Sequence, residues 1–140
     1  MFIQPDIADL NREKERALAR HQNMKLFQLF KVDLEKNPYY FEGIFYAMAT
    51  YSFGSTNKWI INYMLYVKTL MTLGTNSKAR YCIEKASTGE HIGCFALTEM
   101  YHGSFNRGMK SEAHYDHKTK SFAITTNERE GQKFWIGGAA

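Results

Sequence analysis

The hydrophobic pattern of this 140-residue chain changes its period once, at Gly89. Before Gly89, apolar residues recur at helical spacing, and after it short apolar runs alternate with turn residues. The change predicts an α+β chain with an α-helical region at 1–90 and a β region at 91–140. Helices are expected over 6–36, 39–53, 57–73 and 76–85.

Capping and breaking residues set the ends of these helices. Asp6 and Asp9 are candidate N-caps, and Asn37-Pro38 ends the first helix because the residue before proline avoids helical backbone angles. Gly54-Ser55-Thr56 predicts a break in which Ser55 or Thr56 caps the next helix. Gly74 is expected in the left-handed position after a helix. Thr75 or Asn76 starts the last helix, and Gly89 closes it.

The β region is expected to hold short strands at 91–98, 109–115, 121–126 and 133–136. A polar hairpin connection at 116–120 joins the middle pair. Such a meander has two open edges, which folded domains normally pair, cover or charge. The pattern therefore resembles a section of a larger domain.

Composition excludes several classes of protein. The 18 basic and 14 acidic side chains are dispersed, which disfavours a nucleic-acid-binding surface. The longest apolar run, 59–73, is shorter than the roughly 20 residues that cross a bilayer, so no membrane span is expected. Two cysteines cannot build a disulfide scaffold. The possible metal ligands lack the Cys-x-x-Cys or His-x-x-x-His spacing that zinc sites use, so no metal is expected. Those ligands are Cys82, His91, Cys94 and His102.

Two segments could carry a site. At 95–104 a short strand delivers Thr98 to a loop whose glycines let a ligand approach the backbone. At 133–138 Trp135 could lie against a flat ligand. A polar turn and a core tryptophan are the structural alternatives. Glu99 could be a general base, but a carboxylate that anchors the loop through backbone N–H groups is the favoured interpretation.

Segment 93–104, Gly-Cys-Phe-Ala-Leu-Thr-Glu-Met-Tyr-His-Gly-Ser, resembles the acyl-CoA oxidase family of the acyl-CoA dehydrogenase superfamily. The likeness continues through four further pieces: 106–108, 113–116, 122–124 and 133–137. Phe134-Trp135 is most similar to the branched-chain (pristanoyl-type) oxidases. Tyr101 departs from the family, which has a small residue there, and before residue 57 the likeness is thin.

The resemblance implies the fold and the chemistry. The fold would be the end of an N-terminal helical region, followed by the first strands of an antiparallel, β-barrel-like middle domain, truncated. The family binds FAD and oxidises acyl-CoA to trans-2-enoyl-CoA, while O₂ becomes H₂O₂. This is the first step of peroxisomal fatty acid β-oxidation. The peroxisomal location is a family inference, because Gly138-Ala139-Ala140 is not a C-terminal peroxisomal signal. A homodimer is expected for the full-length family member.

The resemblance also implies site residues. Thr98 would hold the flavin ring, and Gly137, where dehydrogenases carry a hydroxyl, would open space for oxygen. The implied cofactor contacts are Thr98, Gly137, Leu97, Phe95 and Trp135. The implied substrate contacts are Ser104 and Gly103. The catalytic glutamate is expected downstream of this chain, so neither Glu99 nor Glu128 takes that role and the chain alone is expected to be inactive.

Three rival interpretations stay open. The chain could come from an acyl-CoA dehydrogenase that passes electrons to a protein acceptor. It could be a catalytically inactive short isoform or fragment without the catalytic glutamate. The third rival, a small basic domain that binds nucleic acid, is disfavoured by the dispersed charge.

Overall fold

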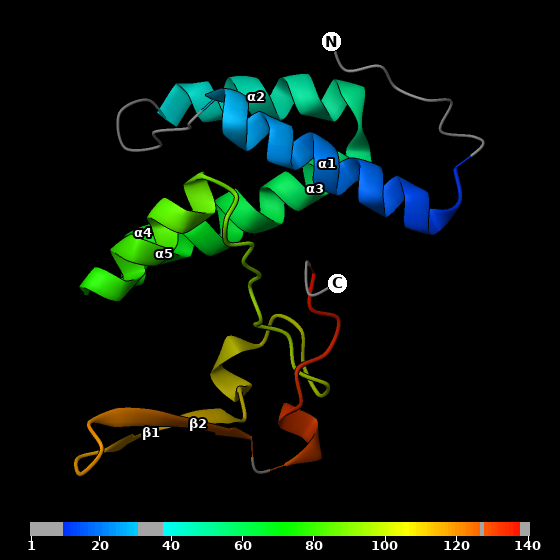
Figure 1. The fold of residues 1–140 in the computed structure, drawn as a ribbon. Helices are drawn as coiled ribbons and strands as arrows, with labels where there is room; N and C mark the ends of the chain where they lie inside the picture. Colours follow the sequence, from blue (N-terminus) through cyan, green and yellow to red (C-terminus); the bar gives the residue numbers. More distant parts are fainter. Residues whose placement is uncertain (1–9, 31–37, 127, 138–140) are drawn as a thin grey trace. The chain divides into compact units, whose positions relative to one another are not determined.

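The computed structural model describes residues 10–30, 38–126 and 128–137. The chain divides into two compact units, Met1–Cys94 and Phe95–Ala140. The first unit is helical and the second carries a two-stranded antiparallel sheet, so the predicted α+β class is confirmed (Figure 1). The predicted domain boundary after residue 90 stays a prediction about the domains of a longer protein.

The predicted helices are present, with different ends. They are α1 (Arg12–Phe30), α2 (Pro38–Tyr51), α3 (Phe53–Trp59), the π-helix η2 (Ile60–Val67), α4 (Lys68–Leu73) and α5 (Ser77–Ser87). α1 begins at Arg12 rather than at residue 6, because the Asn11 side chain caps it by accepting from the Lys14 N–H at 3.0 Å. The predicted caps Asp6 and Asp9, and Asn37, lie outside the described residues.

The predicted break at 54–56 is wrong. The N-cap of α3 is Ser52, whose hydroxyl accepts from the Ser55 N–H at 3.4 Å. Ser55 and Thr56 are therefore inside the helix and buried, and the Ser55 hydroxyl donates to the Gln22 side-chain oxygen on α1. The helical stretch that follows runs without interruption from Phe53 to Leu73.

The two glycines that flank α5 differ in role. Gly74 has φ −77°, so its predicted left-handed conformation is wrong. It is required for space instead, because a Cβ there would collide with Ala79 and with the Leu70 carbonyl. Gly89 has φ 76° and closes α5 as predicted. Asn76 is the predicted N-cap, and its side chain accepts from the Ala79 N–H at 3.0 Å.

The core of the first unit is a stripe along the α3–η2 helix. Trp59, Tyr63 and Val67 follow one another at intervals of four and are 0%, 1% and 0% exposed. Residues four apart lie on the same side of a helix, so these three side chains form one face. The Trp59 and Tyr63 rings lie 4.2 Å apart. The rest of the buried cluster is Leu26, Ile44, Met48 and Ala86.

A second stripe of η2 holds the segment that leaves α5. The Gly93 N–H donates to the buried Asn62 side-chain oxygen at 2.8 Å. The Tyr66 ring lies directly against the Gly93 α-carbon and leaves no room for a Cβ. The strand predicted at 91–98 is therefore wrong: Gly93 gives its N–H to a side chain, and the described part of this segment joins no ladder.

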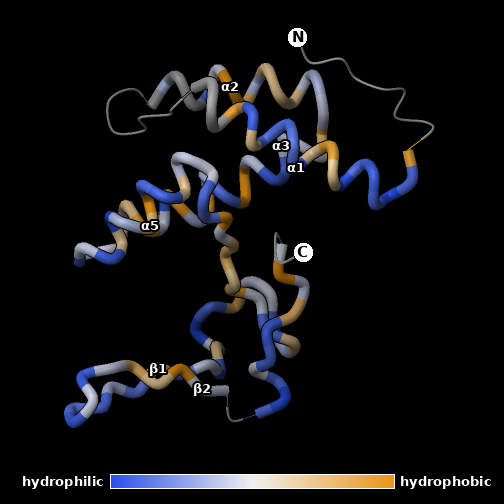
Figure 2. Tube along the Cα trace, viewed as in Figure 1, coloured by the Kyte–Doolittle hydropathy of each residue, from blue (hydrophilic) through white to orange (hydrophobic). Residues whose placement is uncertain are grey.

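The second unit contains β1 (Ser111–Asp116) and β2 (Ser121–Thr126), paired in the register Ser111 with Thr126 through Asp116 with Ser121. Both predicted strands and their polar connection are confirmed, and Figure 2 shows the connection as hydrophilic. The strand predicted at 133–136 is wrong. Lys133 makes one isolated bridge, to Glu99, and Trp135 then takes φ 54°, which ends any extended run.

Side chains alternate faces along the hairpin. One face is apolar and exposed among the described residues: Ala113, Tyr115, Phe122 and Ile124. Two 3₁₀ turns, η3 (Asn106–Gly108) and η4 (Arg129–Gly131), flank the hairpin in sequence. Across the described residues no helix has the length and apolar character that a membrane span needs.

We expect Gly93→Ala to destabilise the protein by about 1–3 kcal/mol, because the new methyl group must displace the Tyr66 ring. Urea unfolding followed by circular dichroism measures the change. Gly43→Ala is the matched control, since that glycine lies in α2 with open space around it. A helical Gly→Ala change there should stabilise by about 0.5–1 kcal/mol. Equal effects at both positions would contradict the assignment of Tyr66 as the obstacle.

Candidate functional site

The two segments that sequence patterns single out separately lie side by side in the second unit. The Phe134 N–H donates to the Thr98 carbonyl at 3.1 Å, and the Met100 N–H donates to the Gln132 carbonyl at 2.9 Å. Glu99 and Lys133 form the single bridge between them. Thr98 and the segment that carries Trp135 are therefore neighbours, although 37 positions separate Thr98 from Trp135 in sequence.

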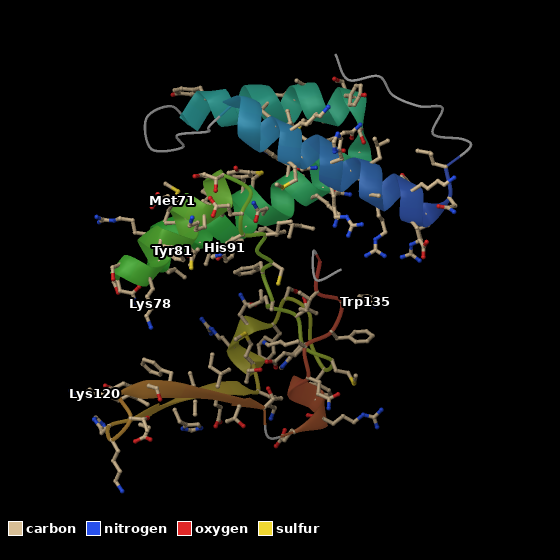
Figure 3. The ribbon with its side chains drawn as sticks, viewed as in Figure 1. Met71, Lys78, Tyr81, His91, Lys120 and Trp135 are labelled. Carbon is tan, nitrogen blue, oxygen red and sulfur yellow. The ribbon has the colours of Figure 1, made fainter. Side chains whose placement is uncertain are left out.

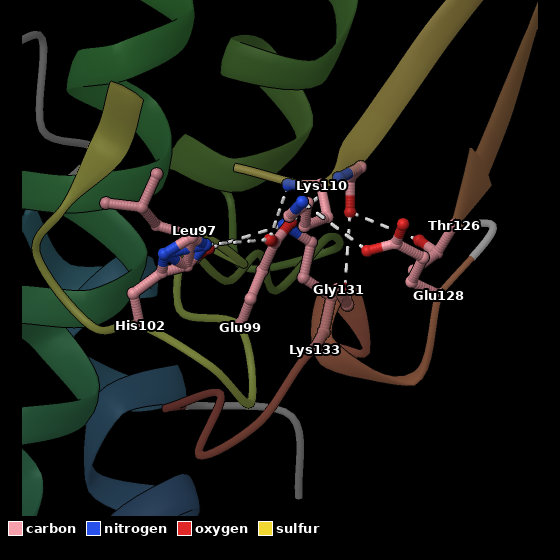
Figure 4. A network of polar contacts seen from close by, with 9 residues as sticks. Leu97, Glu99, His102, Lys110, Thr126, Glu128, Gly131 and Lys133 are labelled. Carbon is pink, nitrogen blue, oxygen red and sulfur yellow. Dashed lines mark hydrogen bonds and ion pairs between the residues drawn. The ribbon is translucent and has the colours of Figure 1, made fainter. Parts of the chain in front are cut away.

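Glu99 is the hub of this arrangement, and its side chain is 2% exposed. Figure 4 shows its carboxylate at the centre of the polar network. It accepts from the Lys110 N–H at 2.7 Å, the Ser111 N–H at 3.1 Å and the Lys133 ammonium at 3.0 Å. The His102 ring nitrogen lies 3.6 Å away. The anchoring role favoured for Glu99 is therefore confirmed. The general-base alternative is not supported, because the carboxylate is buried and its oxygens are already bonded.

These contacts hold the pKa of Glu99 down to about 2. The Lys110 backbone N–H is the largest cause, and it outweighs the burial that alone would raise the pKa of a carboxyl. Ser111 and Lys133 lower it further. The group is therefore an ionised structural anchor at neutral pH, which ties the 97–102 loop to the start of β1 and to the 133 segment.

Thr98 directly precedes this anchor in sequence and is half-buried. Its carbonyl accepts from Phe134, while its hydroxyl has no hydrogen-bond partner within the described part of the chain. Leu97 is different. Its N–H donates to the Phe95 carbonyl at 3.1 Å and its own carbonyl accepts from Lys133 at 3.3 Å. Thr98 has a free polar group to offer a ligand, and the Leu97 backbone does not.

Trp135 has an unusual conformation. Its φ is 54°, a left-handed angle that costs a non-glycine residue about 1–2 kcal/mol. Its side chain is 85% exposed and stacks on Phe134 with ring centres 5.4 Å apart. Figure 3 shows Trp135 on the segment near the C-terminus. The core-tryptophan alternative is therefore wrong. Gly137, two residues further on, is also exposed.

Gly103 and Ser104 lie in the exposed loop between Glu99 and β1. A Cβ on Gly103 would meet nothing within 4 Å. The Ser104 carbonyl accepts from the Asn106 N–H at 3.0 Å, a local turn that leaves the hydroxyl at the surface. Phe95, at the start of the unit, is 39% exposed. These three residues are exposed and therefore accessible to a ligand.

Lys133 is the site residue that sequence reasoning did not assign. It appears in the aromatic segment only as a neighbour of Phe134, yet its ammonium bonds both Glu99 and the Leu97 carbonyl. A buried carboxylate is normally paired with a cation. If Glu99 had been expected to be buried, this rule would have directed attention to nearby lysines such as Lys133. No group of three or more His, Cys, Asp or Glu side chains that could hold a metal ion occurs in the described ranges.

Comparison with known proteins gives a consistent result. No family model matches the chain. Human peroxisomal acyl-coenzyme A oxidase 3 is 30% identical over 140 residues, which is 98% of this chain and 20% of that protein. Drosophila melanogaster acyl-coenzyme A oxidase 1 is 38% identical over 82 residues, 59% of this chain and 12% of its own length.

A solved structure agrees with the sequence comparison. The crystal structure of acyl-CoA oxidase 1 from Yarrowia lipolytica superimposes with a TM-score of 0.81 and 26% identity, over 96% of this chain and 20% of that one. The resemblance predicted from the motifs is therefore confirmed. The chain spans about a fifth of the length of the full relatives it matches.

We expect the stability of the protein to fall as pH drops from about 4.5 toward about 2, because a carboxyl whose pKa is lowered by folding stabilises only while it is ionised. Glu99→Gln should lower the urea midpoint at about pH 6 and flatten this pH dependence. Unfolding curves across that range measure both effects.

Glu130→Gln is the matched control, since that side chain is exposed on η4. It should leave the midpoint and its pH profile unchanged. A Glu99→Gln profile parallel to that of the wild-type protein would refute the anchor.

Proposed function

We propose that this chain is a segment of an acyl-CoA oxidase, given its similarity to such enzymes over nearly its whole length. The complete protein would oxidise acyl-CoA thioesters to trans-2-enoyl-CoA and reduce O₂ to H₂O₂. We place it in the peroxisome, as the names of its relatives suggest, and expect it to be a homodimer. The branched-chain subtype stays a prediction.

The residues at the site fit a flavin. Thr98 offers a free hydroxyl beside a backbone that Phe134 and Glu99 hold in place. Trp135 presents a flat, exposed indole within a strained backbone, and strain of this kind is maintained where a residue has a task. The aromatic face suits stacking or edge contact with the isoalloxazine ring system. Leu97 supports the proposal less, because its backbone groups already have partners.

The observation that carries the proposal is the convergence of Thr98 and the Trp135 segment on one anchored loop. A bound flavin would supply hydride acceptance and transfer of electrons to oxygen. The residues of this chain would do the positioning. Thr98 would fix the ring edge by a hydrogen bond, and Trp135 would cover one side and exclude water. Gly103 and Ser104 would leave room for, and bond, the substrate along the loop.

No proton-abstracting residue is assigned here. Glu99 is ionised but its oxygens are occupied by Lys110, Ser111 and Lys133, so it cannot approach a substrate α-proton. The catalytic glutamate is proposed to lie elsewhere in the longer protein. The 140-residue chain alone is therefore proposed to be inactive.

The polypeptide that carries this sequence should be isolated from its own cells and its intact mass measured. We expect a mass several times 16.3 kDa, a flavin absorption spectrum, and H₂O₂ formed in equal amounts with enoyl-CoA. Reduction of an electron-acceptor dye without peroxide would identify a dehydrogenase instead. A flavin-free chain of 16.3 kDa would overturn the enzyme proposal in favour of an inactive short protein.

In the complete enzyme, Gly137→Thr should slow reoxidation by O₂ about tenfold, equivalent to about 1.4 kcal/mol of barrier, because a side chain would fill space next to the flavin. Anaerobic reduction by acyl-CoA should change less. Stopped-flow absorbance separates the two steps, and Gly43→Ala serves as the control variant. Unchanged reoxidation would remove Gly137 from the determinants of oxygen reactivity.

A further inference from the structure

The helical unit contains a cavity that α1, α2 and α3 line together. α3 packs against both of the other helices (Figure 1). The volume of the cavity is about 290 Å³. Leu26, Ile44 and Met48 line it and are buried, so they form its inner wall. Ala47 is exposed and Tyr51 is half-buried, so these two residues stand where the cavity opens to solvent.

Two polar side chains also line the cavity, and both are buried. Gln22 of α1 is 5% exposed and Ser55 of α3 is 2% exposed. The Ser55 hydroxyl donates to the Gln22 side-chain oxygen, which leaves the Ser55 oxygen free to accept a hydrogen bond. The Gln22 amide nitrogen has no hydrogen-bond partner within the described part of the chain. One donor and one acceptor are therefore available at the same end of the cavity.

Hydrogen bonds between the helices hold this end of the cavity in place. The Asn23 side-chain nitrogen donates to the Ala19 carbonyl on its own helix at 2.8 Å. It also donates to the Ser55 carbonyl on α3 at 3.1 Å. Asn23 is next to Gln22 in sequence and buried, so α1 and α3 are tied together beside the polar pair. The polar end is therefore formed before any ligand binds, as is usual for small-molecule sites.

The size and lining of the cavity define a class of ligand. A cavity of about 150 Å³ lined by aliphatic and aromatic side chains is large enough to hold benzene. A cavity about twice as large has room for roughly 10–12 non-hydrogen atoms. Its lining residues carry no charged side chain. An ionised carboxylate or ammonium would therefore lose its hydration there without gaining a counter-ion, which disfavours charged ligands.

We propose that this cavity binds a free, neutral aliphatic alcohol. The alkyl chain lies against Leu26, Ile44 and Met48. The hydroxyl oxygen accepts from the Gln22 amide, and the hydroxyl hydrogen is donated to the Ser55 oxygen. A hydroxyl is both donor and acceptor, so one group satisfies both side chains. The proposal goes beyond the proposed function and does not depend on it, because binding is measured without turnover.

The complete polypeptide that carries this sequence should be titrated with 1-octanol in a calorimeter. We expect one saturable site, and Ala47→Trp should weaken binding at least about tenfold, because the indole would occupy the opening. Ala49→Trp is the matched control, since Ala49 is exposed on the same helix and is not among the residues that line the cavity. It should bind 1-octanol as the wild-type protein does. No saturable binding, or equal affinity in the two variants, would overturn the proposal.

A second comparison uses only the wild-type protein and varies the ligand. Octanoate has the same chain length as 1-octanol but is ionised at about pH 7.5, so it should bind at least about tenfold more weakly. Equal or tighter binding of octanoate would contradict a site for neutral ligands. Dodecanoyl-CoA should leave 1-octanol bound. Its displacement by the thioester would show that the cavity takes an acyl chain instead and would overturn the proposal.

Discussion

The second unit depends on one buried carboxylate. Glu99 is almost fully removed from water, and an ionised group there is tolerable only if its oxygens are bonded. The bonds come from two backbone N–H groups and one ammonium, supplied by Lys110, Ser111 and Lys133. Lys110 and Ser111 are adjacent at the start of β1, whereas Lys133 lies in the segment that carries Trp135. The same charge therefore closes the loop, sets the start of β1 and draws the aromatic segment alongside Thr98.

The first unit depends on an unusual helix rather than on a charge. The continuous α3–η2 helix places Trp59, Tyr63 and Val67, each four residues from the next, on one buried face. It also sets Asn62 and Tyr66, again four residues apart, against Gly93. One helix thus supplies both core residues and the contacts that hold Gly93.

All the residues that the sequence predicts for the site lie in the second unit, Phe95–Ala140. The second unit gathers an anchored loop, a free threonine hydroxyl and a strained, exposed tryptophan. The similarity to human peroxisomal acyl-coenzyme A oxidase 3 and to the Yarrowia lipolytica structure covers about a fifth of each of those chains. The exposed apolar face of the hairpin fits a domain built from more strands than these two.

Sequence alone determined the features that local chemistry sets. The change of period at Gly89, the Asn76 cap, the hairpin strands and the anchoring role of Glu99 all follow from residue type and spacing. The motif order from 93 to 137 was specific enough to identify the family resemblance. Tertiary structure decided what local patterns leave ambiguous. Ser55 and Thr56 looked like caps, but contacts with α1 bury them inside a helix.

The strands predicted at 91–98 and 133–136 are the clearest case. An apolar run acquires a ladder only if a partner backbone lies beside it. Here Gly93 found the Asn62 side chain instead, and Trp135 took a left-handed angle. Such outcomes depend on residues about 30 positions away, as with Asn62 and Gly93, or on backbone strain that no local pattern encodes. The proximity of Thr98 to the Trp135 segment likewise depends on a tertiary contact, the pairing of Glu99 with Lys133.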